Sequence, residues 1–162
     1  MIPRGTNDWL SVFPLERELA EWKYVGDEEE RVLFVDVGGG RGQQCVALRK
    51  KYSELKGRVV LQDLKETVER RPEIEGVEVM VQDFWKPQAV KGAKFYYFRA
   101  IFHDYPDEKC ADILKSSVPA MGRHSKILVD ETVLPRVGVS SEAMGMDLVM
   151  MACLGSLERT QV

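Results

Sequence analysis

A six-residue apolar run that ends in a glycine-rich loop constrains the fold of this chain more than any other feature. The run at 32–37 is nearly continuous and rich in β-branched residues, as expected for a central strand of a parallel sheet. Four glycines follow within residues 38–42, and a segment with helical character begins at residue 43. A tight turn from strand to helix directs backbone N–H groups and a helix N-terminus toward a ligand. The feature predicts a nucleotide-type site, with a plain tight turn as the alternative.

Segments that resemble strands and helices alternate along the rest of the chain. Strands are predicted at 32–37, 58–62, 77–81, 94–99 and 125–131. Helices are predicted at 15–24, 43–52, 64–71, 107–121 and 142–153. The alternation predicts an α/β fold, a Rossmann-like, mostly parallel sheet of about five strands that binds its ligand beyond the carboxyl ends of the strands. We expect residues 1–31 to form an irregular or helical lead-in and residues 32–162 to form the ligand-binding core.

The composition is that of one ordinary soluble domain. The chain has 162 residues, of which 44% are hydrophobic and 30% are charged, and its formal net charge is -3. Interspersed charges argue against nucleic acid as a partner, because phosphate binding needs a concentrated basic surface. No apolar run approaches the roughly 18 residues of a membrane span, and no signal peptide is evident. Cys45, Cys110 and Cys153 are far apart and lack metal-ligand spacing, so we expect reduced thiols, a cytoplasmic location and no metal site.

The glycine spacing favours S-adenosylmethionine over a dinucleotide. A dinucleotide fingerprint places its third glycine five positions after the first, whereas Gly38 and Gly42 are four positions apart. Asp36 lies near the end of the preceding strand, and an anionic side chain there suits a cationic ligand. S-adenosylmethionine carries both an amino group and a sulfonium. We therefore expect Asp36, Gly38 and Gly40 to contact this cofactor.

Acidic residues also end the next two predicted strands. Asp63, followed by Leu64, can accept the hydroxyls of a ribose, although it could instead cap the following helix. Asp83, followed by Phe84, can reach an adenine edge while the ring of Phe84 lies against the base; the alternative is a turn-forming aspartate. NAD-binding proteins use an acidic residue at the position of Asp63, so that residue does not separate the two cofactors.

Five motifs carry a resemblance to a known family. His-Asp-Tyr-Pro-Asp-Glu at 103–108 resembles the His-Asp-Trp-x-Asp-Glu stretch of plant and fungal small-molecule O-methyltransferases of the caffeic acid and flavonoid type. The other four motifs are the loop at 35–42, Asp-Glu before Leu-Pro at 130–135, Met-Asp-Leu-Val-Met-Met at 146–151 and Glu-Arg-Thr at 158–160. They occur in the family's order over nearly the whole chain. The resemblance implies a class I methyltransferase fold with S-adenosylmethionine as cofactor.

The resemblance also implies catalytic roles. His103 matches the family's general base, and Glu131 and Glu158 match the two acids that flank and orient that histidine. Methyl transfer to a hydroxyl requires that the acceptor be positioned and its proton removed, and histidine can accept a proton near neutral pH. An ordinary loop histidine is the alternative for His103, and His124 is expected to be merely exposed.

Two positions depart from the family pattern at the expected cofactor site. Arg99 stands where the family usually has a cofactor-contacting lysine, and it keeps the positive charge. Tyr105 stands where the family usually has a tryptophan near the adenine, and it keeps the aromatic face. Asp63 and Asp83 match the family's ribose and adenine-side ligands without departure.

The family pattern extends beyond this sequence at both ends. Family members normally begin with a helical dimerisation domain, and only about 30 residues precede the first predicted strand here. They normally continue beyond Glu-Arg-Thr with elements that complete a seven-stranded sheet, so we expect the last two strands to be absent and the core to be incomplete at its C-terminus. An unfinished sheet exposes an edge, which favours a homodimer or swapped assembly. We expect cofactor binding to survive better than catalysis in this chain.

The predicted function is S-adenosylmethionine-dependent transfer of a methyl group to a hydroxyl of an aromatic or secondary-metabolite small molecule. One alternative is a non-catalytic or repurposed methyltransferase-fold domain that binds the cofactor or a partner chain. A less favoured alternative is an NAD-dependent oxidoreductase, which the glycine spacing argues against.

Overall fold

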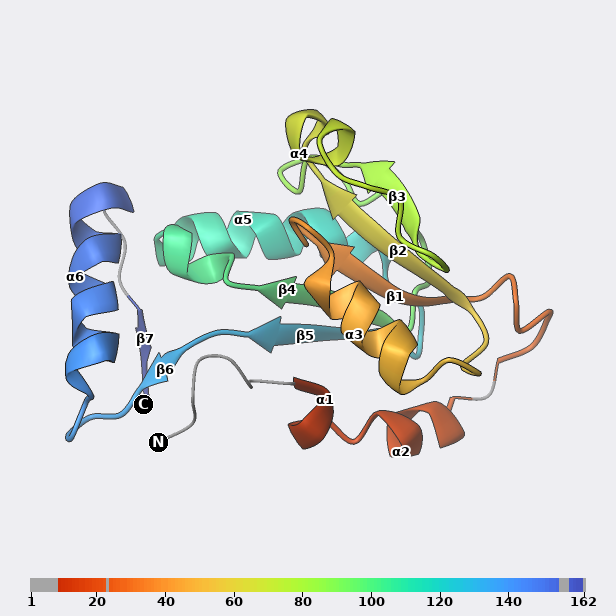
Figure 1. Ribbon diagram of the computed structural model, residues 1–162, viewed down its shortest axis with the longest axis horizontal. Coiled ribbons are helices and arrows are strands. Elements are labelled where there is room, and N and C mark those ends of the chain that lie inside the picture. Colours follow the sequence, from red (N-terminus) through yellow and green to blue (C-terminus); the bar gives the residue numbers. More distant parts are fainter. Residues whose placement is uncertain (1–8, 23, 155–157, 162) are drawn as a thin grey trace.

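A five-stranded sheet lies at the centre of the molecule (Figure 1). The computed structural model describes residues 9–22, 24–154 and 158–161. The strands of the sheet are β1 (Val32–Val37), β2 (Arg58–Asp63), β3 (Glu78–Val81), β4 (Phe95–Arg99) and β5 (Lys126–Asp130). Their order is β3-β2-β1-β4-β5, and every neighbouring pair is parallel. The predicted α/β fold with a mostly parallel sheet of about five strands is confirmed.

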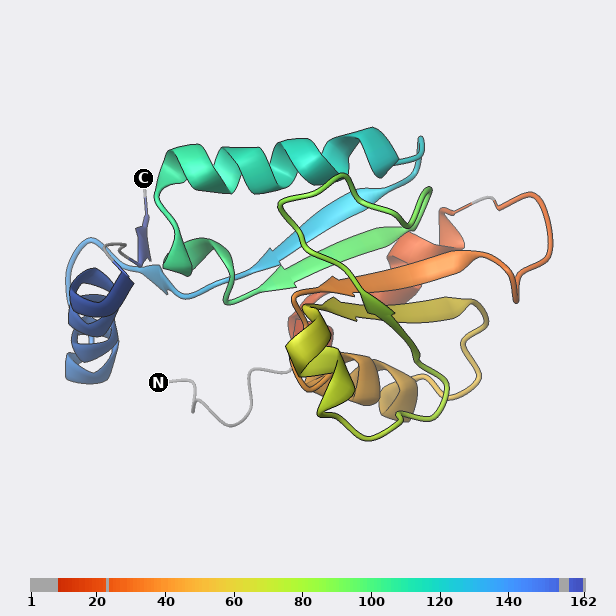
Figure 2. The ribbon, with the colours of Figure 1, turned by 90° about the horizontal axis from the view of Figure 1, so that it is seen from above.

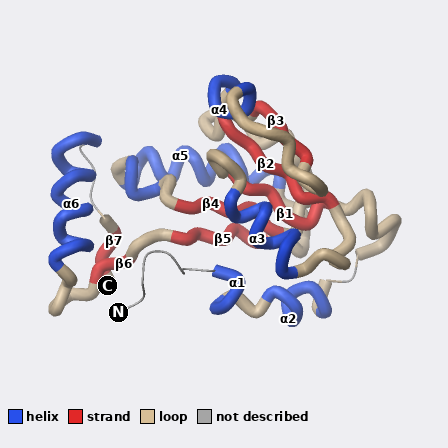
Figure 3. Tube along the Cα trace, viewed as in Figure 1, coloured by secondary structure: helices blue, strands red, loops and turns tan. Residues whose placement is uncertain are grey.

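Helices cover both faces of this sheet. The described helices are α1 (Trp9–Val12), α2 (Leu15–Ala20), α3 (Gln43–Lys51), α4 (Lys65–Glu69), α5 (Asp107–Ser117) and α6 (Ser141–Leu154), with 3-10 turns η1 (Phe102–Asp104) and η2 (Val118–Ala120); α6 lies away from the sheet. Figure 2 shows α5 along one face of the sheet and α3 on the other. Figure 3 shows the same layering, with the strands between the helices.

The apolar run of β1 is continuous because both of its faces are buried. Successive side chains of a strand point to opposite faces. Phe34 packs in the cluster that includes Trp9 and Leu48, from α1 and α3. Val35 packs in the opposite cluster with Ile113 of α5. Helices on both sides therefore hold β1 firmly, and the glycine loop leaves the sheet from a fixed point.

The predicted helix at 107–121 is shorter in the structure. Helix α5 ends at Ser117, and the chain continues as η2 with Pro119 in its first turn. Proline lacks the N–H that an α-helix needs at an interior position, so the regular helix ends ahead of it.

The lead-in differs from its prediction. The predicted helix at 15–24 ends at Ala20 as α2, Lys23 lies outside the described residues, and the short helix α1 was not predicted. Trp22, which follows α2, is buried, and its ring centroid lies 4.9 Å from Cζ of Arg31. Glu18 of α2 is also buried and bonds Lys126 of β5 at 2.5 Å. These contacts bind the lead-in to the sheet.

The C-terminal part stands apart from the main sheet (Figure 1). Strands β6 (Val133–Leu134) and β7 (Arg159–Thr160) form a separate parallel pair beside α6. Neither strand was predicted, because two residues are too short to carry a periodic signal. Helix α6 spans Ser141–Leu154, close to the predicted 142–153.

Candidate active site

The glycine loop is held against the end of β2. The N–H groups of Gly38 and Gly39 both donate to the carbonyl of Gln62, at 2.8 and 3.1 Å. Gly38 and Gly40 have φ angles of 70° and 57°, in the left-handed region that favours glycine. A Cβ on Gly38 would lie 2.7 Å from Cδ1 of Ile101. The loop therefore needs glycine both for its backbone conformation and for its close approach to the segment that carries His103.

Asp36 lies beneath this loop, in the wall of a pocket of about 340 Å³. Its side chain is buried, and burial raises the pKa of the carboxyl from its ordinary value of 3.8 to about 7. The thiol of Cys45 donates to Oδ2 of Asp36 at 3.5 Å. The remaining lining residues come from the glycine loop, the start of α3 and the end of β4: Gly38, Gly39, Gly40, Gln43, Gln44, Arg99 and Ala100.

Asp63 ties the end of β2 to the glycine loop. Its Oδ2 accepts the N–H of Gly40 at 2.8 Å, and its Oδ1 accepts the N–H of Leu64 at 2.7 Å. Helix α4 has no side-chain cap, so the capping alternative does not describe this contact. A carboxylate oxygen has two lone pairs, so each oxygen can still accept a ribose hydroxyl. Leu64 is half exposed beside it.

Asp83 forms a local turn. Its Oδ1 accepts the N–H of Trp85 at 3.0 Å, and its Oδ2 lies 3.9 Å from Nζ of Lys86. The side chain of Asp83 therefore stabilises a local turn, as the alternative interpretation predicted. Its exposed fraction of 31% leaves the carboxylate partly open to a ligand.

Three aromatic rings gather next to this turn. The rings of Phe84 and Tyr105 are 6.1 Å apart, and those of Trp85 and Tyr105 are 5.0 Å apart, both edge to face. Phe84 and Tyr105 were predicted to lie near one base, and the structure brings them together. Trp85 was missed in the sequence reasoning, although its position directly after Phe84 was the available signal.

A buried pair of glutamines connects these loops. Gln62 and Gln88 each donate an amide N–H to the other's amide oxygen at 2.8 Å, and both are almost fully buried. The backbone carbonyl of Gln62 already holds Gly38 and Gly39, so one residue links the glycine loop to the segment that follows β3. Sequence reasoning missed this pair, because nothing local indicates which residue a glutamine contacts.

Arg99 also lines the pocket that contains Asp36. Its guanidinium donates to Oδ2 of Asp130 at 2.6 Å, and the hydroxyl of Tyr97 donates to the same oxygen at 2.5 Å. Ala100, which follows, has a φ of 52° and also lines the pocket. A non-glycine residue in this region is strained, and such strain gathers at functional sites.

His103 lies between two carboxylates. Its Nδ1 is 3.2 Å from Oε1 of Glu158, and its Nε2 is 3.3 Å from Oδ1 of Asp104. Glu158 is buried, and its backbone N–H donates to Oδ1 of Asp147 in α6 at 2.7 Å. His103 and Glu158 are 55 residues apart in sequence, so α6 and the segment after it complete this cluster.

Glu131 contacts the backbone of the same segment rather than the imidazole. Its Oε1 accepts the N–H groups of Ile101 and Phe102 at 2.8 and 2.7 Å. Burial raises the pKa of Glu131, and its Oε2 is buried with no hydrogen-bond partner among the described residues. Glu131 thus holds η1 in place, whereas Glu158 reaches His103 directly.

None of the helices among the described residues is both long and apolar enough to cross a bilayer. In the same residues, no group of three or more His, Cys, Asp or Glu side chains is arranged to hold a metal ion.

The chain is similar in sequence and fold to several known proteins. The demethylsterigmatocystin 6-O-methyltransferase of Aspergillus flavus is 46% identical over 153 residues, which cover 94% of this chain and 39% of that protein. The structure of LepI in complex with S-adenosylhomocysteine (SAH) and a substrate analogue matches with a TM-score of 0.87 and 45% identity, over 96% of this chain and 40% of that one. A structure described as a pericyclic reaction enzyme matches with a TM-score of 0.86 and 45% identity, over 94% and 39% of the two chains.

This chain therefore spans about two fifths of the length of these proteins. Residues 27–162, most of the chain, match the family model described as an O-methyltransferase domain. The resemblance drawn from the five motifs is confirmed, and the chain belongs to the O-methyltransferase domain family.

Proposed function

We propose that this chain forms the cofactor-binding part of an S-adenosylmethionine-dependent O-methyltransferase. It would transfer a methyl group to a hydroxyl of an aromatic or secondary-metabolite small molecule. The observation that carries the proposal is the placement of His103. Its ring contacts Glu158, and Ile101 of the same segment lies close to Gly38 of the glycine loop. A base next to a cofactor loop is the arrangement that methyl transfer to a hydroxyl needs.

The residues around the glycine loop fit a cationic adenosine cofactor. Asp36 offers a buried carboxylate to the amino or sulfonium group, and Gly38 and Gly40 let the ligand approach the backbone. Asp63 keeps free lone pairs for the ribose. The other residues proposed to contact the cofactor are Leu64, Asp83, Phe84, Arg99 and Tyr105.

The catalytic step assigns one role to each group of the histidine cluster. S-adenosylmethionine, when bound, supplies a methyl group already activated on a sulfonium. His103 accepts the proton of the acceptor hydroxyl at one ring nitrogen, while Glu158 accepts the N–H of the other and stabilises the charged ring. Glu131 keeps the backbone of η1 in position through Ile101 and Phe102.

Two measurements test this proposal. Calorimetric titration should show binding of SAH and none of NAD. Methyl transfer to a panel of phenols should then be abolished by His103→Ala and unchanged by His124→Ala, a matched control at the chain's only other histidine. Undiminished transfer by His103→Ala would remove the base assignment.

A second candidate is a repurposed domain that binds the cofactor without transferring its methyl group. It is favoured by one observation, the 45% identity to a protein described as a pericyclic reaction enzyme. Tight SAH binding with no transfer to any phenol would support it. Binding of NAD in place of SAH would instead support an oxidoreductase.

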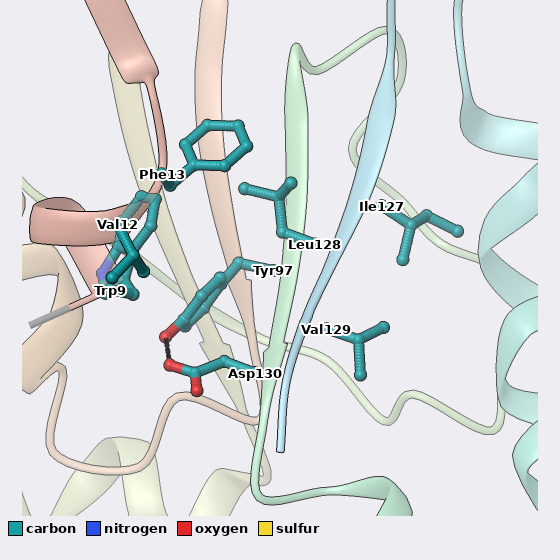
Figure 4. Close-up of a pocket in the computed structure, with 8 residues that line it drawn as sticks. All are labelled: Trp9, Val12, Phe13, Tyr97, Ile127, Leu128, Val129 and Asp130. Atoms are coloured by element: carbon teal, nitrogen blue, oxygen red, sulfur yellow. Dashed lines mark hydrogen bonds between the residues drawn. The ribbon is translucent and has the colours of Figure 1, made fainter. Parts of the chain in front are cut away.

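We also propose a homodimer that covers the outer edge of β5. Figure 4 shows Leu128 and Asp130 pointing toward Trp9 and Tyr97 beside a pocket of about 350 Å³, while Val129 points to the other side. Val129 is 53% exposed, and β5 has no further neighbour in the described sheet. Open edges favour pairing. A monomeric mass by light scattering at micromolar concentration would count against the dimer.

The cytoplasmic location stays a prediction.

A further inference from the structure

Two consecutive arginines follow α4, directly beside the glycine loop. Arg70 closes the helix, and Arg71 comes next in the chain. Together with Arg41 of the loop, they line a cavity of about 570 Å³. Gly40 is the lining residue common to this cavity and to the one that contains Asp36. The remaining lining residues are Glu66, Thr67 and Pro72.

The guanidinium of Arg71 packs against the glycine loop without a counter-charge. Its Nη2 donates to the carbonyl of Arg41 at 3.1 Å, and a Cβ on Gly42 would lie 2.8 Å from the same nitrogen. Nε and Nη1 of Arg71 are both buried and have no hydrogen-bond partner among the described residues. Burying a charged donor without a partner is costly, and an anion nearby offsets that cost. The loop side of the cavity therefore holds a positive charge that the described chain leaves unpaired.

Arg41 and Arg70 bring two exposed guanidinium groups to the same cavity. In the described ranges neither pairs with a carboxylate, whereas Arg58 bonds Glu78 at 2.7 Å. The acidic lining residue is Glu66, which is exposed and forms no ion pair with these arginines in the part of the chain that the structure describes. The lining of the cavity therefore has an excess of two positive charges.

A phosphate group matches this charge and these donors. Guanidinium groups recognise phosphate and carboxylate oxygens through paired N–H donors. A phosphate monoester carries close to two negative charges near neutral pH, so it balances the excess charge better than a carboxylate does. Thr67 adds a hydroxyl to the lining as a neutral donor. The volume falls within the range of small-molecule sites, which leaves room for the organic part of the ester.

We propose that this cavity binds the phosphate group of a phosphorylated small molecule, beside the proposed cofactor site and outside it. Arg71 supplies the buried charge, and the side chains of Arg41 and Arg70 turn toward the phosphate oxygens. The N–H of Gly40 is already donated to Asp63 at 2.8 Å, so recognition relies on the side chains. The proposal does not depend on methyl transfer, because Gly40 is the one residue that it shares with the proposed cofactor site.

NMR titration of the ¹⁵N-labelled chain tests the site at constant ionic strength. The two probes are glycerol 3-phosphate and inorganic phosphate. The backbone amide signals of Arg41, Thr67 and Arg71 should shift together and saturate with one dissociation constant. We expect glycerol 3-phosphate to bind more tightly than inorganic phosphate. Equal affinities would assign free phosphate to the site and overturn the assignment to a phosphorylated small molecule, and shifts that do not saturate would overturn the site itself.

Arginine variants separate this site from a general attraction to anions. Arg71→Gln and Arg70→Gln should each weaken glycerol 3-phosphate binding about tenfold, the effect of one lost hydrogen bond to a charged group. Arg70 is exposed, so its variant keeps the fold even if Arg71→Gln does not. Arg123→Gln, at an exposed position in the turn before β5, is the matched control and should leave the affinity unchanged. Equal losses in all three variants would contradict the proposal.

A glutamate variant should have the opposite effect. Glu66→Gln removes the negative charge of the lining, so glycerol 3-phosphate should bind about threefold more tightly, the effect of one exposed charge. Glu69→Gln is the matched control, because Glu69 lies on the same helix, 3.6 Å from Lys65, and does not line the cavity. It should leave the affinity unchanged. Equal tightening by both variants would mean that net charge alone governs binding, and the site would be ruled out.

Competition with SAH locates the phosphate. Glycerol 3-phosphate should keep its affinity when SAH is bound, because the two cavities meet at Gly40 and share no other lining residue. Displacement of the phosphate by SAH would place it in the cofactor pocket and overturn the proposal. Failure of SAH to bind would count against the proposed function alone, and the titrations of the arginine and glutamate variants would still decide the phosphate site.

Discussion

Two regions of the molecule are built in different ways. The glycine-loop region (residues 36–44, 62–64 and 83–88) is cross-linked by hydrogen bonds between neighbouring strand ends, such as Gly40 to Asp63 and Gln62 to Gln88. In the histidine region (η1, β6, α6 and residues 158–161), η1 packs on the core through Phe102, and Glu158 joins η1 to α6 through its contacts with His103 and Asp147. Its helix α6 leaves large apolar side chains exposed: Met144, Leu148, Val149, Met151 and Leu154.

The difference bears on where each half of the proposed function lies. The core clusters that hold β1 fix the point from which the glycine loop leaves the sheet, and most of the residues proposed to contact the cofactor come from this loop and the neighbouring strand ends. The histidine region depends on α6, whose apolar surface is left for something else to cover. Changes in the glycine-loop region should therefore affect both stability and cofactor binding, while changes on α6 should affect neither.

The largest effect expected is a pH-dependent one at Asp36. The carboxyl has a pKa of about 7 in the folded chain and 3.8 as its ordinary value, so between these values the folded chain keeps a proton that the unfolded chain has lost. The contribution of Asp36 to the free energy of unfolding is therefore fully present below about pH 4 and is lost as the pH rises through about 7. The loss amounts to about 4 kcal/mol at roughly 1.4 kcal/mol per pKa unit.

Asp36→Asn should remove this dependence of stability on pH. Urea unfolding of the unaltered chain and of Asp36→Asn, between pH 4 and pH 8, gives the difference between their free energies of unfolding. This difference should shift by about 4 kcal/mol in favour of the variant as the pH rises. Asp112→Asn, at an exposed position, controls for the loss of a charge. A difference that stays constant with pH would show that Asp36 ionises in the folded chain as it does in the unfolded one.

The next effect concerns Gly38, where the two regions touch. Gly38→Ala places a Cβ 2.7 Å from Cδ1 of Ile101 at a φ of 70°, so the loop backbone is strained and the Ile101 side chain must move. We expect SAH affinity to fall about 30-fold, because holding a non-glycine residue in this conformation costs about 2 kcal/mol, which SAH binding must supply. Gly92→Ala is the matched control, because Gly92 has a φ of 66° and no atom within 4 Å of the new Cβ. Equal loss of affinity in both variants would mean that a general loss of stability, rather than a local change in the glycine loop, lowers SAH affinity.

These two regions also differ in how well the sequence predicts them. The loop, Asp36 and Asp63 were predictable because a parallel sheet brings the carboxyl ends of its strands to one edge. The contacts of Glu131 with backbone N–H groups were not predictable, because the family pattern identifies Glu131 but not the atoms to which it bonds. Even within the glycine-loop region, the pairing of Gln62 with Gln88 joins residues 26 apart, and no periodicity encodes it. Local pattern predicts which elements form, while tertiary packing decides which polar groups meet.

A smaller effect is expected when one member of the glutamine pair is removed. Gln88→Leu leaves the buried amide of Gln62 without its partner, which should cost about 2 kcal/mol in the free energy of unfolding. Replacing both by leucine should cost less than the sum of the two single changes, because an apolar pair leaves fewer buried groups unsatisfied. Denaturant unfolding of the two single variants and the double variant measures this coupling. Strictly additive costs would mean that the two amides do not stabilise each other.

The smallest effect is expected at Leu148 on α6. Its side chain is 57% exposed, so Leu148→Gln should change the free energy of unfolding by less than about 0.5 kcal/mol and leave SAH affinity unchanged. Leu48→Gln is the matched comparison, since Leu48 is 1% exposed in the cluster that supports β1, and a polar group buried there should cost about 3 kcal/mol or more. If a second copy covers α6, Leu148→Gln will instead lower the mass seen by light scattering, and its cost will depend on protein concentration. That outcome would extend the contrast between the two regions, because the histidine region would then owe its stability to association and the glycine-loop region to its own core.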